Sequence, residues 1–456
     1  MRFLLWIITA LLAGCARAPQ TDAAPVKRVV FVLVDTLRYD HFGRAGDPRG
    51  LTPRLDALAE EGAWFPRALA AASWTRPSLA SIFTGLHPGA HGVEDGHDAL
   101  PPELPTIPQL LSAAGMTCLA VSANANGGPA FGFDRGFDRF RVPLERRGYP
   151  DDFAKIPGDV VVAKGLELLA EVGDQESFFL FLHLLDPHDP YLEHPGLLNT
   201  PEPDGRFQGA RQDLRRMDAE DPSAVTEQDR DRVRWLYSGE VRFADECIGR
   251  LLDALAARGW LEDTLVVITS DHGEELWNHG RRGHGHSLYQ ELVHVPMILR
   301  YPPALGLGGR SVASMAHHVD LMPTILNYCG VPVPEGLPGR DLRPAVADAA
   351  RASGPGYVVS QLNHFGVTLE CVTDFSLKRI MDPTSAQEAL FDLRVDGGEQ
   401  HPLPDPAAAG AAALRQFHAA ILEQIRRSRA EGVRPARPEL GADVRAELAG
   451  LGYAGD

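Results

Sequence analysis

RVVFVLVD, residues 28–35, indicates the fold class, because an unbroken apolar run stands between a cation, Arg28, and a carboxylate, Asp35. A half-buried strand alternates apolar and polar residues, whereas a strand covered on both faces is apolar throughout, as in parallel sheets. We therefore predict a central parallel strand that ends in a carboxylate. Further buried strands are expected at 117–122, 178–184, 264–269 and 295–300.

Helical patterns separate these strands. Thr52 and Pro53 open a helix that runs to about Gly62, with Thr52 expected as the N-cap and Pro53 at the first position. The other helices expected in this part of the chain are 106–114, 159–171 and 226–258. Strands that alternate with helices predict an α/β fold, with a mainly parallel central sheet and helices on both faces.

The pattern changes after about residue 340. Short strands are expected at 356–361, 367–373 and 375–381, and helices follow at 409–430 and 442–450. We therefore predict a main domain at 28–340 and a small C-terminal α+β subdomain at 341–456. This division replaces the equal domains that a chain of 456 residues suggests at about 150 residues per domain.

Residues 1–15 have the layout of an export signal. Arg2 supplies a positive charge, residues 3–12 form an apolar run, and small residues precede Cys15. An apolar run of about ten residues is too short for a transmembrane helix, which needs about 20, but it fits a signal peptide. We expect residues 16–27 to form a linker.

Residues 11–15, LLAGC, resemble a bacterial lipobox, in which the cysteine is lipidated and becomes the mature N-terminus. The resemblance implies an exported lipoprotein of the cell envelope, anchored through Cys15 to the outer membrane or to the periplasmic face of a bacterial membrane. An ordinary signal peptide cleaved nearby is the alternative.

Charge and cysteine content exclude two classes of protein. The balance of 44 Lys and Arg against 61 Asp and Glu gives a net charge of −17, which repels nucleic acid, so no nucleic-acid partner is expected. Five cysteines are too few for a disulfide-dense scaffold of this length. Those beyond Cys15 are expected to be buried small side chains, with one bridge possible: Cys118, Cys247, Cys329 and Cys371.

Side chains able to do chemistry gather at the ends of the predicted strands. In open α/β sheets, ligands bind beyond the carboxyl ends of the strands. Asp35 ends the first strand, and Asp271 and His272 follow another. Residues 183–188, HLLDPH, close a third, and residues 73–78, SWTRPS, lead into a helix. We expect these segments to meet at one edge of the sheet and form a site.

Asp35, Thr75, Asp271 and His272 make up the predicted metal set. Two carboxylates, one imidazole and one hydroxyl suit a single divalent ion such as Mn²⁺, Zn²⁺ or Ca²⁺. Thr75 precedes Pro77 at a helix start, where free N–H groups and the positive end of the helix dipole lie. In isolation it is a simple N-cap. Beside a metal, its hydroxyl is able to lose a proton and attack a tetrahedral phosphorus or sulfur centre.

Several motifs follow one another along the chain in a fixed order. They are VVFVLVDTLRYDHFG, SWTRPSLASIFTGLHPGAHGV, FLHLLDPHDPY, YSGEVRFADECIGRLL, VVITSDHGEEL, HGRRGHGHSLYQELVHVPMIL, HHVDLMPTIL and the tail ELAGLGY. Together they resemble the sulfatase branch of the alkaline phosphatase superfamily, from about Arg28 to Tyr453. The resemblance implies an alkaline-phosphatase/sulfatase-like fold and a metal-dependent hydrolase of sulfuric or phosphoric ester bonds.

Thr75 departs from the pattern of that family. Sulfatases carry a Cys or Ser, converted to formylglycine, at the head of a C/S-x-P-x-R pattern, where this chain has Thr75 and then Leu79 in place of the Arg. Threonine cannot become an aldehyde by that route, so no formylglycine is expected. Thr36 replaces the second Asp of the usual pair. The metal set is similar instead to that of one-metal, threonine-nucleophile relatives such as lipoteichoic-acid synthases and phosphoethanolamine transferases.

Histidines occupy the positions at which the family contacts the ester. His188 matches the sulfatase histidine that contacts the ester oxygens, and either His284 or His286 takes the place of a second cationic group. Histidine offers an anion charge or a hydrogen bond and, when protonated, can donate to the leaving oxygen. The resemblance therefore implies catalytic and substrate-binding roles for these side chains. A second metal held by Asp186, His188 and His286 is a further alternative.

Other polar residues near the motifs are weaker candidates. Arg76 is a candidate for substrate binding. The alternative for both Arg76 and Arg38 is a solvated side chain on the surface. His183 is expected to be structural. Glu274 and Glu275 are expected to be structural or to support the metal ligands.

Thr75 and the metal set together predict the activity. We expect an exported, sulfatase-like hydrolase of phosphate, phosphonate or sulfate esters, whose metal-activated threonine replaces formylglycine. Its partner is an anionic ester, either a small molecule or a glycan or lipid head group. The alternatives are a true arylsulfatase-like sulfuric ester hydrolase, a phospho-group transferase acting on an envelope substrate, and a non-catalytic surface binding lipoprotein. The oligomeric state stays open.

Overall fold

A computed structural model describes residues 25–453, apart from 151, 221–223, 304, 305, 307, 355, 405–409, 431 and 432. The predicted signal peptide, the lipidation site at Cys15 and most of the predicted linker lie outside the described residues. Within the described part of the chain, no helix has both the length and the apolar character needed to cross a membrane. All the cysteines described there are free, so the possible bridge is not formed.

A mixed sheet with β1 near its centre organises the main domain. Its strand order is β13–β2–β12–β9–β1–β8–β4–β5. In chain order the strands are β1 (Arg28–Val34), β2 (Ala63–Trp64), β4 (Thr117–Ser122), β5 (Arg139–Arg141), β8 (Phe178–Leu184), β9 (Thr264–Thr269), β12 (Met297–Arg300) and β13 (Arg310–Ser311). The central strands β9, β1, β8 and β4 pair in parallel, as predicted, whereas β12 is antiparallel to β9.

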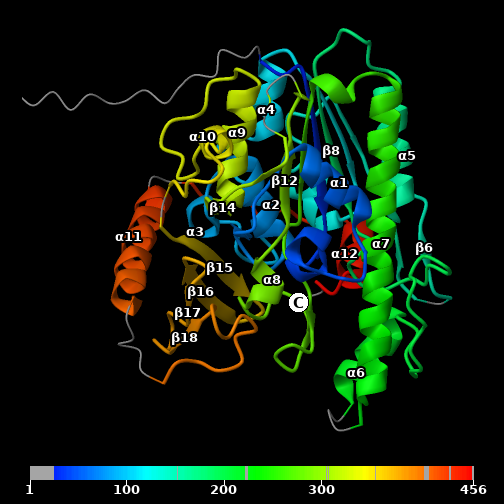
Figure 1. The fold of residues 1–456 in the computed structure, drawn as a ribbon, viewed down its shortest axis with the longest axis vertical. Helices are drawn as coiled ribbons and strands as arrows, with labels where there is room; N and C mark the ends of the chain where they lie inside the picture. Colours follow the sequence, from blue (N-terminus) through cyan, green and yellow to red (C-terminus); the bar gives the residue numbers. More distant parts are fainter. Residues whose placement is uncertain are drawn as a thin grey trace, which may run out of the picture.

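Helices cover both faces of this sheet (Figure 1). One layer contains α1 (Pro53–Glu61), α5 (Gly158–Leu169) and the long α7 (Glu227–Ala257), and α7 contacts both of the others. The other contains α2 (Thr75–Thr84), α4 (Ile107–Ala113) and α9 (Leu321–Tyr328). Because both faces are covered, β1 is buried along its whole length, which explains its unbroken apolar sequence.

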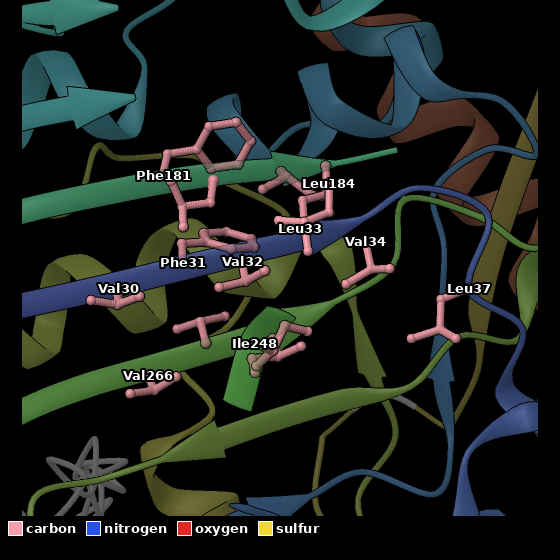
Figure 2. Packing of buried hydrophobic residues seen from close by; sticks show 14 of the residues in the cluster. Val30, Phe31, Val32, Leu33, Val34, Leu37, Phe181, Leu184, Ile248 and Val266 are labelled. Carbon is pink, nitrogen blue, oxygen red and sulfur yellow. The ribbon is translucent and has the colours of Figure 1, made fainter. Parts of the chain in front are cut away.

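The core lies on both sides of β1. Phe31 of β1 and Phe181 of β8 are register partners, so their side chains lie side by side (Figure 2), and their ring centroids lie 5.6 Å apart in an edge-to-face arrangement. Ile248 of α7 is fully buried and belongs to the same core cluster. Each such side chain contributes about 1.5–3 kcal/mol of hydrophobic free energy when fully buried.

The start of α1 differs from the prediction in one respect. The helix begins at Pro53 as expected, but the Thr52 side chain does not cap it. Its hydroxyl accepts a hydrogen bond from the Gly43 N–H at 2.8 Å, and the Asp245 carboxylate of α7 accepts the N–H groups of Arg54 and Leu55 at 3.1 and 2.8 Å. The free N–H groups of the first turn are thus satisfied by a neighbouring helix instead of by the local sequence.

The C-terminal part forms a four-stranded antiparallel sheet, in the order β15–β16–β17–β18. Its strands are β15 (Val358–His364), β16 (Val367–Thr373), β17 (Leu377–Met381) and β18 (Glu388–Asp392), the last of which the sequence analysis missed. α11 (Ala411–Ala430) packs against this sheet, whereas α12 (Ala442–Gly450) lies apart from it and contacts the short turn Ala125–Gly127 that follows β4. The last helix has therefore returned to the main domain.

Short elements connect these layers. The two-stranded pairs are β3 (Ala68–Leu69) with β14 (Ala316–His317), β6 (Arg147–Gly148) with β7 (Ala154–Lys155), and β10 (Glu275–Leu276) with β11 (Arg282–Gly283). The remaining short helices are α3 (Pro88–His91), α6 (Arg211–Ala219), α8 (Gln290–Val293) and α10 (Arg343–Ala347).

Candidate active site

The predicted segments meet at the carboxyl edge of the central strands. Asp35 directly follows β1, Asp271 and His272 follow β9, and Thr75 is the first residue of α2. All four side chains are fully buried. The parallel alignment of β9, β1 and β8 places the ends of these strands side by side, which brings together residues that are far apart in the chain.

Buried acceptor atoms without partners show that a cation fits this cluster. Ligand atoms of Asp35, His183 and Asp271 all lie within 4.8 Å of one another. Asp35 Oδ1, Asp271 Oδ2 and His183 Nε2 have no hydrogen-bond partner. Burial and the nearby charge of Asp35 both raise the pKa of Asp271 above its ordinary value. A divalent cation would satisfy these atoms and balance the two carboxylates.

His183 lies in this cluster, although the sequence analysis assigned it a structural role. It is paired with Leu33 in the register of β8 against β1, and its Nε2 lies 3.3 Å from Asp35 Oδ2. The strand register therefore carries its imidazole to the end of β1. The structure places His183 among the candidate metal ligands, a role that the sequence analysis did not predict.

His272 links the metal cluster to Thr75. Its Nδ1 lies 2.8 Å from the Gly273 carbonyl oxygen, so Nδ1 carries the proton and Nε2 is free to act as a ligand. That Nε2 lies 3.4 Å from Thr75 Oγ1 and 3.4 Å from Asp271 Oδ2. Thr75 does not cap α2 with its side chain, because Trp74 occupies the N-cap position. The hydroxyl of Thr75 is thus directed to the cluster.

Asn124 belongs to the same surroundings and was not predicted. Its Nδ2 donates to Asp35 Oδ2 at 2.6 Å and to Thr75 Oγ1 at 3.5 Å. The signal was present in the sequence, because Asn124 follows shortly after the buried strand β4, at the same edge as the other site residues.

His188 is held by the residue that follows it. Its Nδ1 lies 2.7 Å from the Asp189 carbonyl oxygen and 3.2 Å from the Asp189 carboxylate. Burial alone would lower the pKa of His188, but the hydrogen bond and charge of Asp189 outweigh burial and raise that pKa to about 9. The buried Nε2 of His188 has no partner, so it is available to an anionic ligand.

The structure separates His284 from His286. The ring of His284 lies 4.5 Å from that of His272 and 5.0 Å from that of His188. Its Nδ1 lies 3.1 Å from Glu274 Oε1, and its burial holds the pKa of His284 well below the ordinary value. His286 instead lies 2.7 Å from Glu275 and lines another cavity, so it does not join the cluster.

Arg76 is directed away from the cluster. Its guanidinium donates to the carbonyl oxygens of Gly96 and Asp98 at 2.6 and 3.2 Å and to Asn126 Oδ1 at 2.7 Å, and it lies 3.5 Å above the Phe131 ring. The prediction that Arg76 binds substrate is therefore not retained, and neither is the view that it is solvated. Arg38 is also buried, and it is paired with Asp40.

The alternative with a second metal is not supported by the positions of its residues. The Asp186 carboxylate accepts the N–H of Gly158 at 2.8 Å, while His286 pairs with Glu275. Among the described residues, Asp35, His183 and Asp271 are the only group of three that could hold a metal ion.

Comparisons with known proteins identify the family that the chain resembles. A sequence profile of the sulfatase family matches residues 27–331, and a profile of the C-terminal part of N-sulphoglucosamine sulphohydrolase matches residues 284–403. The chain is 26% identical to an N-acetylglucosamine-6-O-sulfatase of Bacteroides thetaiotaomicron, over 87% of this chain and 86% of that protein. It is 27% identical to arylsulfatase A of Homo sapiens, over 76% of this chain and 71% of that protein.

Solved structures share the fold at low sequence identity. One, a protein in complex with its substrate D-glucosamine-2-N,6-O-disulfate, superposes with a TM-score of 0.71 at 19% identity, over 88% of this chain and 98% of that one. A phosphonate monoester hydrolase from Silicibacter pomeroyi superposes with a TM-score of 0.69 at 23% identity, over 88% and 96%.

Proposed function

The chain belongs to the sulfatase family of metal-dependent hydrolases that act on sulfate esters, and from that premise we propose that Thr75 is its nucleophile in place of formylglycine. The observation that carries the proposal is the position of Thr75 Oγ1, at the N-terminus of α2 and 3.4 Å from His272 Nε2. Helix N-termini stabilise negative charge, so this position favours both an ionised hydroxyl and an anionic ester.

Asp35, Asp271, His183 and His272 would hold one divalent ion beside Thr75, with Mn²⁺, Zn²⁺ and Ca²⁺ as the candidate ions. When bound, such an ion lowers the pKa of a hydroxyl next to it and offsets the charge of an anionic ester. The orphaned oxygens of Asp35 and Asp271 support this assignment.

Thr75 and the side chains around it would carry out the reaction in two steps. Thr75 Oγ forms a bond to sulfur as the bond from sulfur to the alcohol oxygen breaks, and the alcohol takes up the proton that Thr75 loses. Water then cleaves the sulfothreonine and releases sulfate. The unpartnered Nε2 of His188 is free to hydrogen-bond to the ester oxygens, and Asn124 orients Asp35 and Thr75. His284 lies beside His188, but both of its ring nitrogens are already within hydrogen-bond distance of protein groups.

Replacement of Thr75 tests the nucleophile. Thr75→Ala should lower turnover of an aryl sulfate by on the order of a thousandfold, whereas Thr75→Ser should keep most of it, because it keeps the hydroxyl. Mass spectrometry of the enzyme quenched during turnover should show one sulfate group on the peptide that contains Thr75. Thr84→Ala, at the other end of α2, is the control for helix stability. Unchanged turnover by Thr75→Ala would reject the proposal.

Phosphate and phosphonate esters are the second candidate substrates, because Thr75 forms an ordinary ester with phosphorus and does not need the geminal diol of formylglycine. Competition between aryl sulfate, phosphate and phosphonate on one preparation separates the two. A preference for phosphorus by about tenfold or more, which is about 1.4 kcal/mol, would make the enzyme a phosphohydrolase. Product analysis with an added acceptor alcohol would reveal a transferase.

For the natural substrate, we propose a sulfated sugar or glycan. The support is the similarity to relatives whose names specify such substrates, including an N-acetylglucosamine-6-O-sulfatase and an ulvan-active sulfatase. A panel of sulfated monosaccharides, assayed by sulfate release, tests it. Turnover confined to aryl esters would contradict it.

We also propose that the protein is exported and anchored through a lipidated Cys15, as the LLAGC sequence implies. Expressed in a bacterium, Cys15→Ser should move the protein from the membrane fraction to the soluble fraction. Equal fractionation of the two proteins would contradict the anchor.

A further inference from the structure

The C-terminal tail returns to the main domain and packs on it. Leu448 and Leu451 are buried in the same hydrophobic cluster as the central sheet. Arg215 donates to the Ala449 carbonyl oxygen at 3.2 Å, which holds the end of α12 against α6. These contacts fix the end of the chain relative to the candidate active site.

Gly450 permits the close approach of the tail. A Cβ at this position would lie 2.2 Å from the Phe153 ring, so a larger residue would displace the tail. Gly452 then turns the chain with a φ of +91°, a conformation that glycine adopts without strain. This turn directs the next residue, Tyr453, toward α2.

Tyr453 reaches the residues that surround the nucleophile. Its hydroxyl lies 2.8 Å from His284 Nε2, and the His284 ring lies 4.5 Å from that of His272, whose Nε2 is 3.4 Å from Thr75 Oγ1. Its ring lies beside those of Trp74 and His364, with centroids 6.0 and 5.9 Å away. A hydroxyl bonded to an imidazole this near the nucleophile is placed where an ester oxygen is able to bind.

Tyr453 also lines a cavity of about 240 Å³ outside the metal cluster. The other residues that line it are Asp95, Gly96, His97, Asn363, His364, Phe365 and Gly366. Neither carboxylate of the metal cluster, Asp35 or Asp271, is among the residues that line this cavity. Tyr453 is therefore common to the anion site and to the space where the rest of a substrate would lie.

Resting on the proposed function, we propose that Tyr453 is a further catalytic residue, whose O–H donates a hydrogen bond to the alcohol oxygen of the ester while the alcohol part lies in this cavity. Thr75 loses one proton, the leaving alcohol gains one, and Tyr453 keeps its own. The alcohol is a hydroxylated ring, because Asp95 and Asn363 offer hydrogen-bond partners and the largely exposed Phe365 offers an apolar face.

The dependence of rate on the leaving group tests this role. A hydrogen bond to the leaving oxygen matters most when the departing alcohol is a weak acid. Tyr453→Phe should therefore lower kcat/KM for phenyl sulfate by about tenfold, while 4-nitrophenyl sulfate loses less than about threefold. Tyr357→Phe, which removes a hydroxyl beside the separate cavity near Phe417, is the matched control and should leave both rates unchanged.

Truncation after Leu451 supplies the second variant, with circular dichroism melting to show that it folds. It should show the same selective loss for phenyl sulfate. Equal losses on both esters would overturn the proposal, and so would no loss at all. A truncated enzyme faster than the full chain would overturn it too, because the tail would then be a plug.

Parallel assays of Thr75→Ala keep the two proposals distinguishable. Full activity of Thr75→Ala would reject Thr75 as the nucleophile. The rates of Tyr453→Phe on the two aryl sulfates would still decide whether Tyr453 assists the leaving group. Wild-type behaviour of Tyr453→Phe, with an inactive Thr75→Ala, rejects Tyr453 alone.

Discussion

Lys155 is a fully buried cation that supports the loop carrying His188. Its Nζ donates to Glu240 Oε1 at 2.7 Å and to the His188 carbonyl oxygen at 3.0 Å, and it also contacts the Asp186 carbonyl oxygen. Neither the lysine nor Glu240 is exposed to solvent. Removal of one partner from a buried ion pair destabilises the fold, because the other charge stays buried without an opposite charge beside it.

We therefore expect Lys155→Met to lower the free energy of unfolding by about 3–5 kcal/mol. Urea denaturation of the variant against the parent measures the change. Lys164→Met is the control, because Lys164 forms only part-exposed ion pairs on α5 and should change stability by less than about 1 kcal/mol. A loss below about 1 kcal/mol for Lys155→Met as well would show that Glu240 is not left as an unpaired charge.

Asp245 gives stability a defined pH dependence. Burial raises the pKa of Asp245 to about 6 in the folded chain, against about 3.9 in an unfolded one. Between these values the folded state binds more protons at this group, so the free energy of unfolding falls as pH rises from about 4 to about 6. The contribution is on the order of 2 kcal/mol.

Asp245→Asn should remove this slope, because the amide does not titrate yet can still accept an N–H from α1. Chemical denaturation of both proteins from pH 4 to pH 7 measures it. The parent should lose more stability than the variant across this range, by on the order of 2 kcal/mol. Asp253→Asn, at an exposed position on the same helix, should keep the parental slope. Parallel slopes for Asp245→Asn and the parent would contradict the shifted pKa.

The sequence identified some site residues and missed others for a clear reason. Asp35 directly follows an unbroken apolar run, and Asp271 follows the short apolar run 265–268 after Thr269 and Ser270, so their place at the sheet edge could be predicted from these runs. His183 lies inside such a run, and its role depends on β8 being the neighbour of β1. Tyr453 comes to Thr75 only through the packing of the tail. Sheet order and tail packing are tertiary features that local patterns do not encode.

At the scale of elements, the predicted strands and helices follow from periodicity, while their ends depend on neighbours. β1, β8 and α7 were predicted closely because long apolar or amphipathic runs leave little choice. The start of α1 was placed correctly but its cap was not, because Asp245 comes from α7. β18 was missed because its sequence, EALFD, is short and only partly buried.

The pairing of β1 with β8 makes Phe181 a sensitive position. Its ring packs edge-to-face on Phe31 at 5.6 Å and on Phe83 at 5.1 Å, and it is fully buried. Phe181→Ala should lower the free energy of unfolding by about 3–5 kcal/mol, because it removes buried surface and leaves a cavity. Guanidinium denaturation measures this loss. Leu144→Ala, at an exposed position, should change stability by less than about 0.5 kcal/mol. Similar effects of both substitutions would mean that the sheet does not pack as described.

At the scale of the whole molecule, the candidate metal site joins segments that only the fold brings together. Asp35, His183 and Asp271 come from three neighbouring strands of the central sheet. An ion bound there would connect these strands at one edge. Without an ion, the two buried carboxylates repel one another. Burial and the charge of Asp35 therefore raise the pKa of Asp271.

Removal of the metal should therefore destabilise the entire chain and not only abolish activity. An ion that binds the folded chain alone, at about 100 times its dissociation constant, adds about 2.7 kcal/mol to the free energy of unfolding. We expect the chelated protein to melt at a lower temperature than the same protein with Mn²⁺, Zn²⁺ or Ca²⁺ restored, as calorimetry would show. Asp271→Asn should lose most of this response, because it removes a ligand and the repulsion together. Glu275→Gln, a buried carboxylate paired with His286 outside the cluster, should retain the response. Equal melting temperatures with and without a saturating ion would contradict a metal site at Asp35, His183 and Asp271. An ion that binds there binds only the folded chain and must therefore stabilise it.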